Sequence, residues 1–231
     1  MDAFRNQIAQ ALVEITSQNP ATIKDAEARL KSWEHSPRFY PVLQDVFIDK
    51  SFPADVRLLA VIHLKNGVDR YWRKTSRNAL SEEDKQAIQS RLLENFNEPS
   101  RQIAVQNSVL ISRVARWSND SAWPDLLPSL ARLIVGVATL SLPQRTAEHH
   151  TIEQNAMYCL HLIIKTQCSR TLAINRRALQ QVSPALLGEV LKIYNTRVYE
   201  FFATIQTGQA HAAMDALREV RFALKIIRRL L

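Results

Sequence analysis

The sequence predicts an all-α protein, and three observations support this fold class. The chain has only four glycines in 231 residues, which is too few for the many tight turns of a sheet protein. Its β-branched residues recur with the 3.6-residue period of helices, where strands would require alternation. Prolines stand at most breaks between the periodic segments, and proline suits the first turn of a helix because its missing N–H would be unsatisfied there.

The breaks divide the chain into about ten predicted helices that follow one another in pairs. In each pair, the apolar stripes of the two helices can be buried against each other. The first break, at Asn19-Pro20, and a later one near Pro53 place a proline where a helix should start. The predicted pairs are residues 2–17 with 22–34, 37–49 with 54–74, 81–95 with 99–116, 124–139 with 144–167, and 176–206 with 209–231.

Two of these helices carry further local signals. In "LSEEDKQ", Ser81 is followed three residues later by Asp84, a pattern typical of a capped helix start with acids facing the positive helix end. Ser183-Pro184 falls inside the ninth helix. We expect that helix to bend there, because a proline inside a helix removes one backbone hydrogen bond.

The spacing of the second helices predicts how the pairs assemble. Equivalent second helices recur about every 35 to 50 residues, the period of HEAT-type arrays in which each hairpin buries its apolar face on its neighbours. The sequence therefore predicts an α–α superhelix of about five HEAT-type hairpins. We expect it to form a single solenoid arch over residues 1–231.

Composition narrows the function classes. The sequence has no run of about 18 apolar residues, so we expect a soluble chain without membrane insertion. It also lacks a phosphate-binding glycine loop, GxSxG, HExxH and CxxC, so we expect neither an enzyme nor a cofactor. The "EHH" at residues 148–150 suggests a metal site only weakly, because adjacent residues on a helix point about 100° apart. The net charge of +8 is scattered among acids and reads mostly as solvated surface.

One segment, "VRLLAVIHLKNGVDRYWRK", is apolar all round in its first half and polar along one arc in its second. In a stacked array, the inner helix of a middle hairpin has three apolar sides and one side that faces the concave groove. Helical projection places Lys65, Asn66, Asp69 and Arg73 on that side. Matching arcs on later second helices contain Gln102, Gln106 and Arg113, then Gln154, Tyr158, His161 and Lys165, then His211, Asp215, Arg218, Lys225 and Arg229. Periodicity alone leaves open whether these arcs bind a partner or are simply solvated.

The order of several motifs resembles the importin-beta family. The run from Ala26 to Lys74 is similar to the N-terminal region of that family: a helix ending in tryptophan, a short helix, then a long helix with an "LKN" turn and a basic end. The segments "LSEEDKQAIQSRLLENFNEPSRQIAVQNSVLISRVAR" and "WPDLLPSL" continue the pattern in order. The resemblance implies an importin-beta N-terminal segment over residues 26–100, with further HEAT repeats over residues 100–231.

The resemblance also implies a function. Members of the family are nuclear transport receptors whose first repeats hold the small GTPase Ran in its GTP form, so we expect a chain that moves between cytoplasm and nucleus through the pore. By position in the motif, Lys65 and Asn66 match the GTPase-facing segment best, and Asp69 and Arg73 extend it. Gln102, Gln106 and Arg113 form the next rung, and Gln154, His161 and Lys165 follow from projection only.

Two departures from the family pattern keep an alternative open. Family members are generally acidic, whereas this chain carries +8. The alternative function is therefore a basic helical-repeat module whose groove binds nucleic acid or another acidic partner, although nucleic acid is the less expected partner. The final "RFALKIIRRLL" lies in a helix with unpartnered apolar residues, and solenoids need polar caps. We therefore expect later repeats, where relatives contact cargo and nucleoporins, to be missing here.

Overall fold

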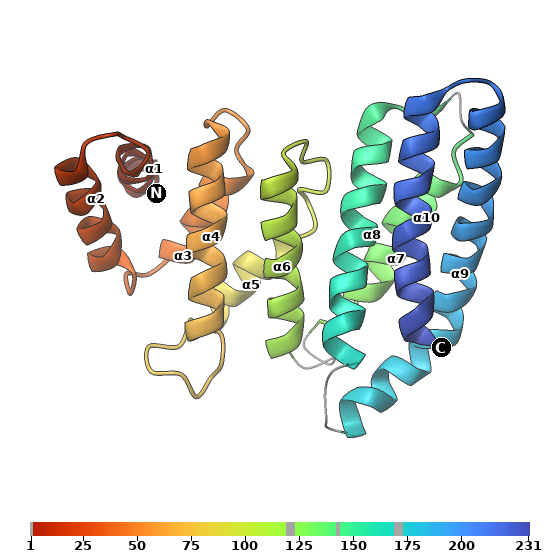
Figure 1. The fold of residues 1–231 in the computed structure, drawn as a ribbon. Helices are drawn as coiled ribbons and strands as arrows, with labels where there is room; N and C mark the ends of the chain where they lie inside the picture. The colour runs from red at the N-terminus through yellow and green to blue at the C-terminus, as the bar shows by residue number, and fades with distance from the viewer. Residues whose placement is uncertain (1, 119–122, 142–143, 169–172) are drawn as a thin grey trace. The chain divides into compact units, whose positions relative to one another are not determined.

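The computed structural model describes residues 2–118, 123–141, 144–168 and 173–231. Within these ranges the regular structure is ten α-helices and no strand (Figure 1), which confirms the predicted all-α class. The helices are α1 (Asp2–Ile15), α2 (Pro20–Trp33), α3 (Phe39–Ile48), α4 (Ala54–Tyr71), α5 (Glu82–Arg91), α6 (Arg101–Trp117), α7 (Leu126–Ala138), α8 (Ala147–Cys168), α9 (Ala173–Gln206) and α10 (Ala210–Leu230).

The predicted helix starts are present in atomic detail. The Asn19 side chain accepts a hydrogen bond from the Ala21 backbone N–H at 3.0 Å, and Pro20 takes the first helical position of α2. Ser81 Oγ accepts from the Asp84 backbone N–H at 3.1 Å at the start of α5. Both side chains satisfy a backbone donor that the helix itself leaves without a partner, so the predicted cap at Ser81 is confirmed.

Two helices end at least three residues before their predicted ends. Helix α4 ends at Tyr71 and not at Lys74, so Arg73 lies just beyond the helix. Helix α5 ends at Arg91, before the predicted Asn95, and turns continue to Asn97. Helix α9 runs through Pro184 without a break. Figure 1 shows that α9 is bent in its first part, and a bend is expected of a helix that contains a proline, because the proline removes one backbone hydrogen bond.

The helices fall into two compact units. The first unit comprises residues 1–95 and 100–117. In it, α1 packs on α2, α3 packs on α4, and α4 also packs along α6. Its core is formed by apolar side chains with no more than 1% of their surface exposed, among them Ile8, Leu12, Leu43, Phe47, Leu64, Val68, Leu110 and Ile111.

The second unit comprises residues 96–99 and 118–231. Its helices form two layers. One layer is α7 with α9 and the other is α8 with α10, and across the layers α7 packs on α8 and α9 packs on α10. The short segment at residues 96–99 is held by Asn155 Nδ2, which donates to the backbone oxygens of Phe96 and Glu98 at 2.9 and 3.0 Å. No helix in the described ranges combines the length and apolar character needed to cross a membrane.

Candidate functional site

Helix α4 is positioned by burial along most of its circumference. Val56, Ala60, Val61, Leu64 and Val68 are all at most 1% exposed, because α1, α3 and α6 each pack against this helix. The sequence expectation of an inner helix enclosed by several neighbours is therefore confirmed for α4. Only the polar side of α4 remains available to contact a partner.

Gly67 lets α4 approach α3 closely. A Cβ atom at this position would overlap the ring of Tyr40, which lies directly against the glycine backbone. Tyr40 is itself 3% exposed, so its ring has little freedom to move away. Gly67 is therefore required by packing, in the middle of the segment that carries the predicted binding residues.

Predicted polar residues on α4 and just after its end meet residues of α6 in three successive contacts, which we call the α4–α6 rungs. Lys65 Nζ donates to Gln106 Oε1 at 2.8 Å. Asp69 forms an ion pair with Arg113. The Arg73 guanidinium lies 4.1 Å above the Trp117 ring, within the range of a cation–π contact.

The rungs are half-exposed and carry an excess of positive charge. The side chains of Arg113 and Asp69 retain 34% and 36% of their exposed surface. Burial, and then the neighbouring Arg113, lower the pKa of Lys65. Burial, and then Arg116, lower the pKa of Arg113. Asp69 is thus one carboxylate among several cations, and the face suits a partner that supplies acceptors.

The two other predicted residues of this region lie apart from the rungs. Gln102 is exposed in the first turn of α6. Asn66 instead lines a cavity of about 330 Å³ between α2, α3 and α4. In that cavity, Glu34 Oε1 accepts hydrogen bonds from Tyr40 Oη at 3.2 Å and from Arg70 Nη1 at 3.3 Å.

The cavity was not anticipated from the sequence. Projection of one helix at a time cannot show that Glu34 of the α2–α3 turn and Arg70 of α4 meet. Burial lowers the pKa of His63, which also lines this cavity, even though Glu34 and Glu27 oppose the shift. The cavity is therefore lined by acidic and basic side chains together with the imidazole of His63.

The remaining predicted residues lie on α8, in the second unit. Gln154 Nε2 donates to Asp215 Oδ1 of α10 at 3.3 Å. His161 is half-buried, and burial followed by the charges of Lys225 and Arg229 lowers its pKa to about 4. The structure thus brings Gln154 and His161 together with polar residues of α10, and Lys165 lies near His161 on the same helix, in a unit separate from that of the rungs.

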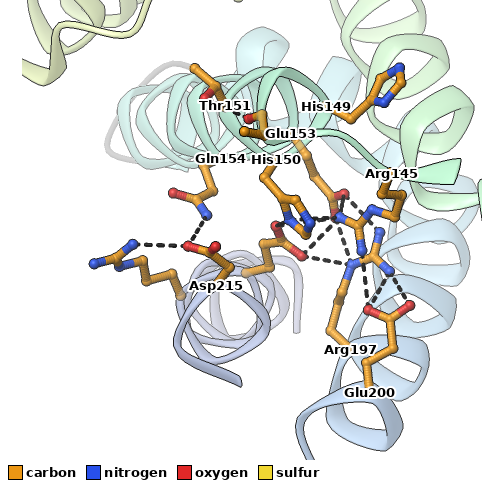
Figure 2. Close-up of polar contacts among 12 residues, drawn as sticks. Arg145, His149, His150, Thr151, Glu153, Gln154, Arg197, Glu200 and Asp215 are labelled. Atoms are coloured by element: carbon orange, nitrogen blue, oxygen red, sulfur yellow. Dashed lines mark hydrogen bonds and ion pairs between the residues drawn. The ribbon is translucent and has the colours of Figure 1, made fainter. Parts of the chain in front are cut away.

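The second unit also contains a buried charge cluster that the sequence analysis missed. It joins Arg145, just before α8, to Glu153 of α8, Arg197 and Glu200 of α9, and Glu219 of α10 (Figure 2). Glu153, Arg197 and Glu219 have 0% of their surface exposed. The sequence alone predicts mostly solvated charge, because a charged residue is almost never fully buried unless it is paired and these partners lie on different helices.

The guanidiniums of the cluster each contact several carboxylates. Arg197 Nη2 lies 2.7 Å from Glu153 Oε2, and its Nη1 lies 2.8 Å from both oxygens of Glu200. Arg145 Nη2 donates to Glu153 Oε2 at 2.6 Å. Burial, and then the Glu219 carboxylate, raise the pKa of Glu153. The cluster ties three helices and the segment before α8 to one another.

The histidines of "EHH" point to different partners. His149 Nδ1 lies 3.1 Å from Thr146 Oγ1, whereas His150 Nδ1 lies 3.1 Å from Glu219 Oε1 at the edge of the cluster (Figure 2). In the described ranges, no three histidine, cysteine, aspartate or glutamate side chains gather where they could hold a metal ion.

Comparison with known proteins places this geometry in a family. Residues 26–98 match the importin-beta N-terminal domain. Over 230 residues the chain is 34% identical to importin-11 of Mus musculus, a match that covers 100% of this chain and 22% of that protein. The chain therefore contains an importin-beta N-terminal domain. Importin-beta receptors are not enzymes, and the chain spans about a fifth of the length of the relatives it matches.

Solved structures agree on the fold. The chain is similar to Lph2, a bidirectional nuclear transport receptor of S. cerevisiae, with 29% identity and a TM-score of 0.74 over 92% of this chain and 20% of that one. It is also similar in fold to Kap95p, whose structure with RanGDP shows the Ran switch loops in the GTP-bound conformation, with 17% identity and a TM-score of 0.57 over 97% and 28%. These matches to importin-beta relatives confirm the predicted superhelix of HEAT-type hairpins.

The match to importin-11 also bears on particular motifs. The segments "GVDRYWRK", "LSEEDKQ", "NFNEP" and "WPDLLPSL" predict similarity to this member of the family, and that prediction is confirmed by the identity over the whole chain. Helix α4 with Lys65 and Asp69, and Arg73 just beyond its end, lie inside the matched importin-beta N-terminal domain. The residues of α6 that they contact lie just beyond that domain, because α6 begins at Arg101.

Proposed function

We propose that the chain is the N-terminal part of a nuclear transport receptor and that the α4–α6 rungs bind the small GTPase Ran in its GTP form. The observation that carries this proposal is the meeting of Lys65, Asp69 and Arg73 with Gln106, Arg113 and Trp117 on one half-exposed face. Part of that face lies in the importin-beta N-terminal domain. Kap95p, which has a similar fold, binds Ran in its structure with RanGDP, and this supports Ran as the partner.

Recognition of the GTP form would follow from order in the GTPase. In the GTP state the γ-phosphate and its Mg²⁺ hold the switch segments in place, and hydrolysis releases them. An ordered switch segment can offer carboxylates and carbonyls to Lys65 and Arg113 at fixed positions. A released segment would lose conformational entropy on binding, so its affinity would be lower.

The internal contacts of the rungs prepare the face for binding. Gln106 and Asp69 hold Lys65 and Arg113 in place, which reduces the entropy lost when a partner immobilises these long side chains. Binding here would alter the packing of α4 on α6. Through later repeats of a longer protein it would then change affinity for cargo and nucleoporins, and this coupling would act equally in the other direction. The protein would accordingly shuttle between cytoplasm and nucleus.

An exchange of charges tests the rungs without removing their ion pair. Asp69→Arg with Arg113→Asp keeps one cation and one carboxylate in contact across α4 and α6 but reverses which helix presents each. We expect at least about a tenfold loss of affinity for Ran loaded with a non-hydrolysable GTP analogue, because opposed like charges at an interface cost several kcal/mol. The thermal midpoint of the chain should change little.

The matched control exchanges an exposed pair on another helix. Glu189→Lys with Lys192→Glu reverses the 2.9 Å pair on α9 and should leave Ran binding unchanged. Wild-type affinity in the Asp69–Arg113 exchange, measured on a folded chain, would remove the rungs from the GTPase site.

A further inference from the structure

The face that α8 and α10 share in the second unit carries cations without acids beside them. We call this set the α8–α10 basic patch, and its members are Lys165, Arg221, Lys225, Arg228 and Arg229. Lys165, Arg221 and Arg228 are exposed, and Lys225 and Arg229 are half-buried. Among the residues that the structure describes, none of the five forms an ion pair, whereas neighbouring Arg218 pairs with Asp215 at 2.9 Å.

The cations of the patch act on one another. Burial, and then Arg221 and Arg228, lower the pKa of Lys225. Burial, followed by Lys225, Arg229 and Lys165, lowers the pKa of His161 of α8. A group of like charges held this close disfavours its own protonated state. An anionic partner would relieve that repulsion on binding.

Helix dipoles explain only part of the patch. Lys165, Arg228 and Arg229 lie in the last turns of α8 and α10, where cations complement the negative helix end. Arg221 and Lys225 lie earlier, and the dipole effect falls off within the last turn. The helix dipole therefore does not explain the cations at Arg221 and Lys225, and a binding partner would explain them.

We propose that the α8–α10 basic patch binds an acidic amphipathic helix of a protein partner. Arg221, Lys225 and Arg229 recur every four residues, about 6 Å apart along α10, and acidic residues four apart on a partner helix share this period. Leu217 and Leu224 alternate with Arg221 and Arg228 along α10 and are 42% and 47% exposed. Such leucines suit a partner that also presents apolar side chains.

The patch is less suited to nucleic acid. Single-stranded nucleic acids are held by cations together with aromatic rings on which bases stack. Two rings beside the patch, Tyr158 and Phe222, are half-buried and pack against each other with centroids 5.7 Å apart, and Lys225 Nζ already lies 5.5 Å from the centroid of Phe222. A phosphate backbone would also leave Leu217 and Leu224 without a partner.

Fluorescence anisotropy with the full chain tests this proposal. The first probe is a labelled amphipathic peptide with glutamates every four residues and leucines between them, and the second is a thymidine oligonucleotide of equal charge. We expect the peptide to bind more tightly than the oligonucleotide at moderate salt. Lys165→Glu with Lys225→Glu should weaken peptide binding at least about tenfold, because each reversal places like charges opposite each other.

Two further variants complete the test. Lys24→Glu with Arg77→Glu makes the same change in net charge at exposed positions of the first unit and should leave peptide binding unchanged. Lys165→Gln with Lys225→Gln serves if the charge reversals disturb folding, and should weaken binding by a smaller factor. Tighter binding of the oligonucleotide, or equal peptide affinity in the patch and control variants, would overturn the proposal.

Discussion

At the scale of single residues, close packing and charge decide which positions tolerate change. Gly67 lies under the Tyr40 ring, so the backbone of α4 approaches α3 more closely than any side chain would allow. Gly136 of α7 has no atom near the place where a Cβ would lie. The two positions share a residue type and a helical conformation, yet only Gly67 is fixed by its surroundings.

Alanine substitution should therefore act in opposite directions at these glycines. Gly67→Ala should destabilise the chain by about 1 to 3 kcal/mol, because the new methyl group overpacks the contact with Tyr40. Gly136→Ala should stabilise it by up to about 1 kcal/mol, since alanine favours helix more than glycine does. Urea unfolding of both variants measures the difference. An equal gain at both positions would show that Tyr40 does not constrain Gly67.

His161 provides a residue-scale prediction about pH. Its pKa falls from 6.5 to about 4 in the folded chain. Between these values the unfolded chain binds a proton that the folded chain does not. The contribution of His161 to the free energy of unfolding is therefore fully present above pH 6.5 and is lost as the pH falls towards 4.

Removing the imidazole should remove this dependence. We expect the free energy of unfolding of the wild type to fall relative to that of His161→Gln as the pH is lowered from neutral towards 4. Urea unfolding at a series of pH values measures both. Parallel curves for the two proteins would mean that His161 titrates alike in the folded and unfolded chain.

At the scale of helices, the second unit is held together by charge as well as by apolar packing. Arg197 is the largest fully buried side chain among the described residues, and its guanidinium contacts carboxylates from α8, α9 and α10. Removing one partner of such a cluster leaves uncompensated charge in the core, which costs more than the pairing itself contributes.

Arg197→Met tests this arrangement with little change in volume. We expect it to destabilise the second unit by about 3 to 5 kcal/mol, because the buried carboxylates lose one of their two guanidiniums. Lys192→Met, on the same helix at an exposed pair, should change stability by no more than about 0.5 kcal/mol. A loss as small at Arg197 as at Lys192 would show that the cluster is not required for folding.

The helices were predictable from the sequence, and the contacts between them were not. Apolar period, prolines and the Ser81 cap mark the helices because these signals are local. The ion pair of Asp69 with Arg113 joins residues on different helices, and projection shows only that each faces outwards. Glu153 and Arg197 looked like solvated charges for the same reason, since their partners lie on other helices.

At the scale of the molecule, the two proposals assign different partners to different units. The rungs of the first unit lie on α4 and α6, and the basic patch of the second unit lies on α8 and α10. The chain spans 22% of the length of importin-11. Loss of Ran binding in the rung variants and loss of peptide binding in the patch variants are expected to be independent.

Binding of the wild-type chain to Ran in its two nucleotide states decides whether the first unit recognises the GTPase. Calorimetric titration would compare Ran loaded with a non-hydrolysable GTP analogue and Ran loaded with GDP. We predict at least about tenfold tighter binding of the GTP form, a coupling within the range usual for conformational switches. Equal affinity for the two forms, or no binding to either, would contradict the proposed function.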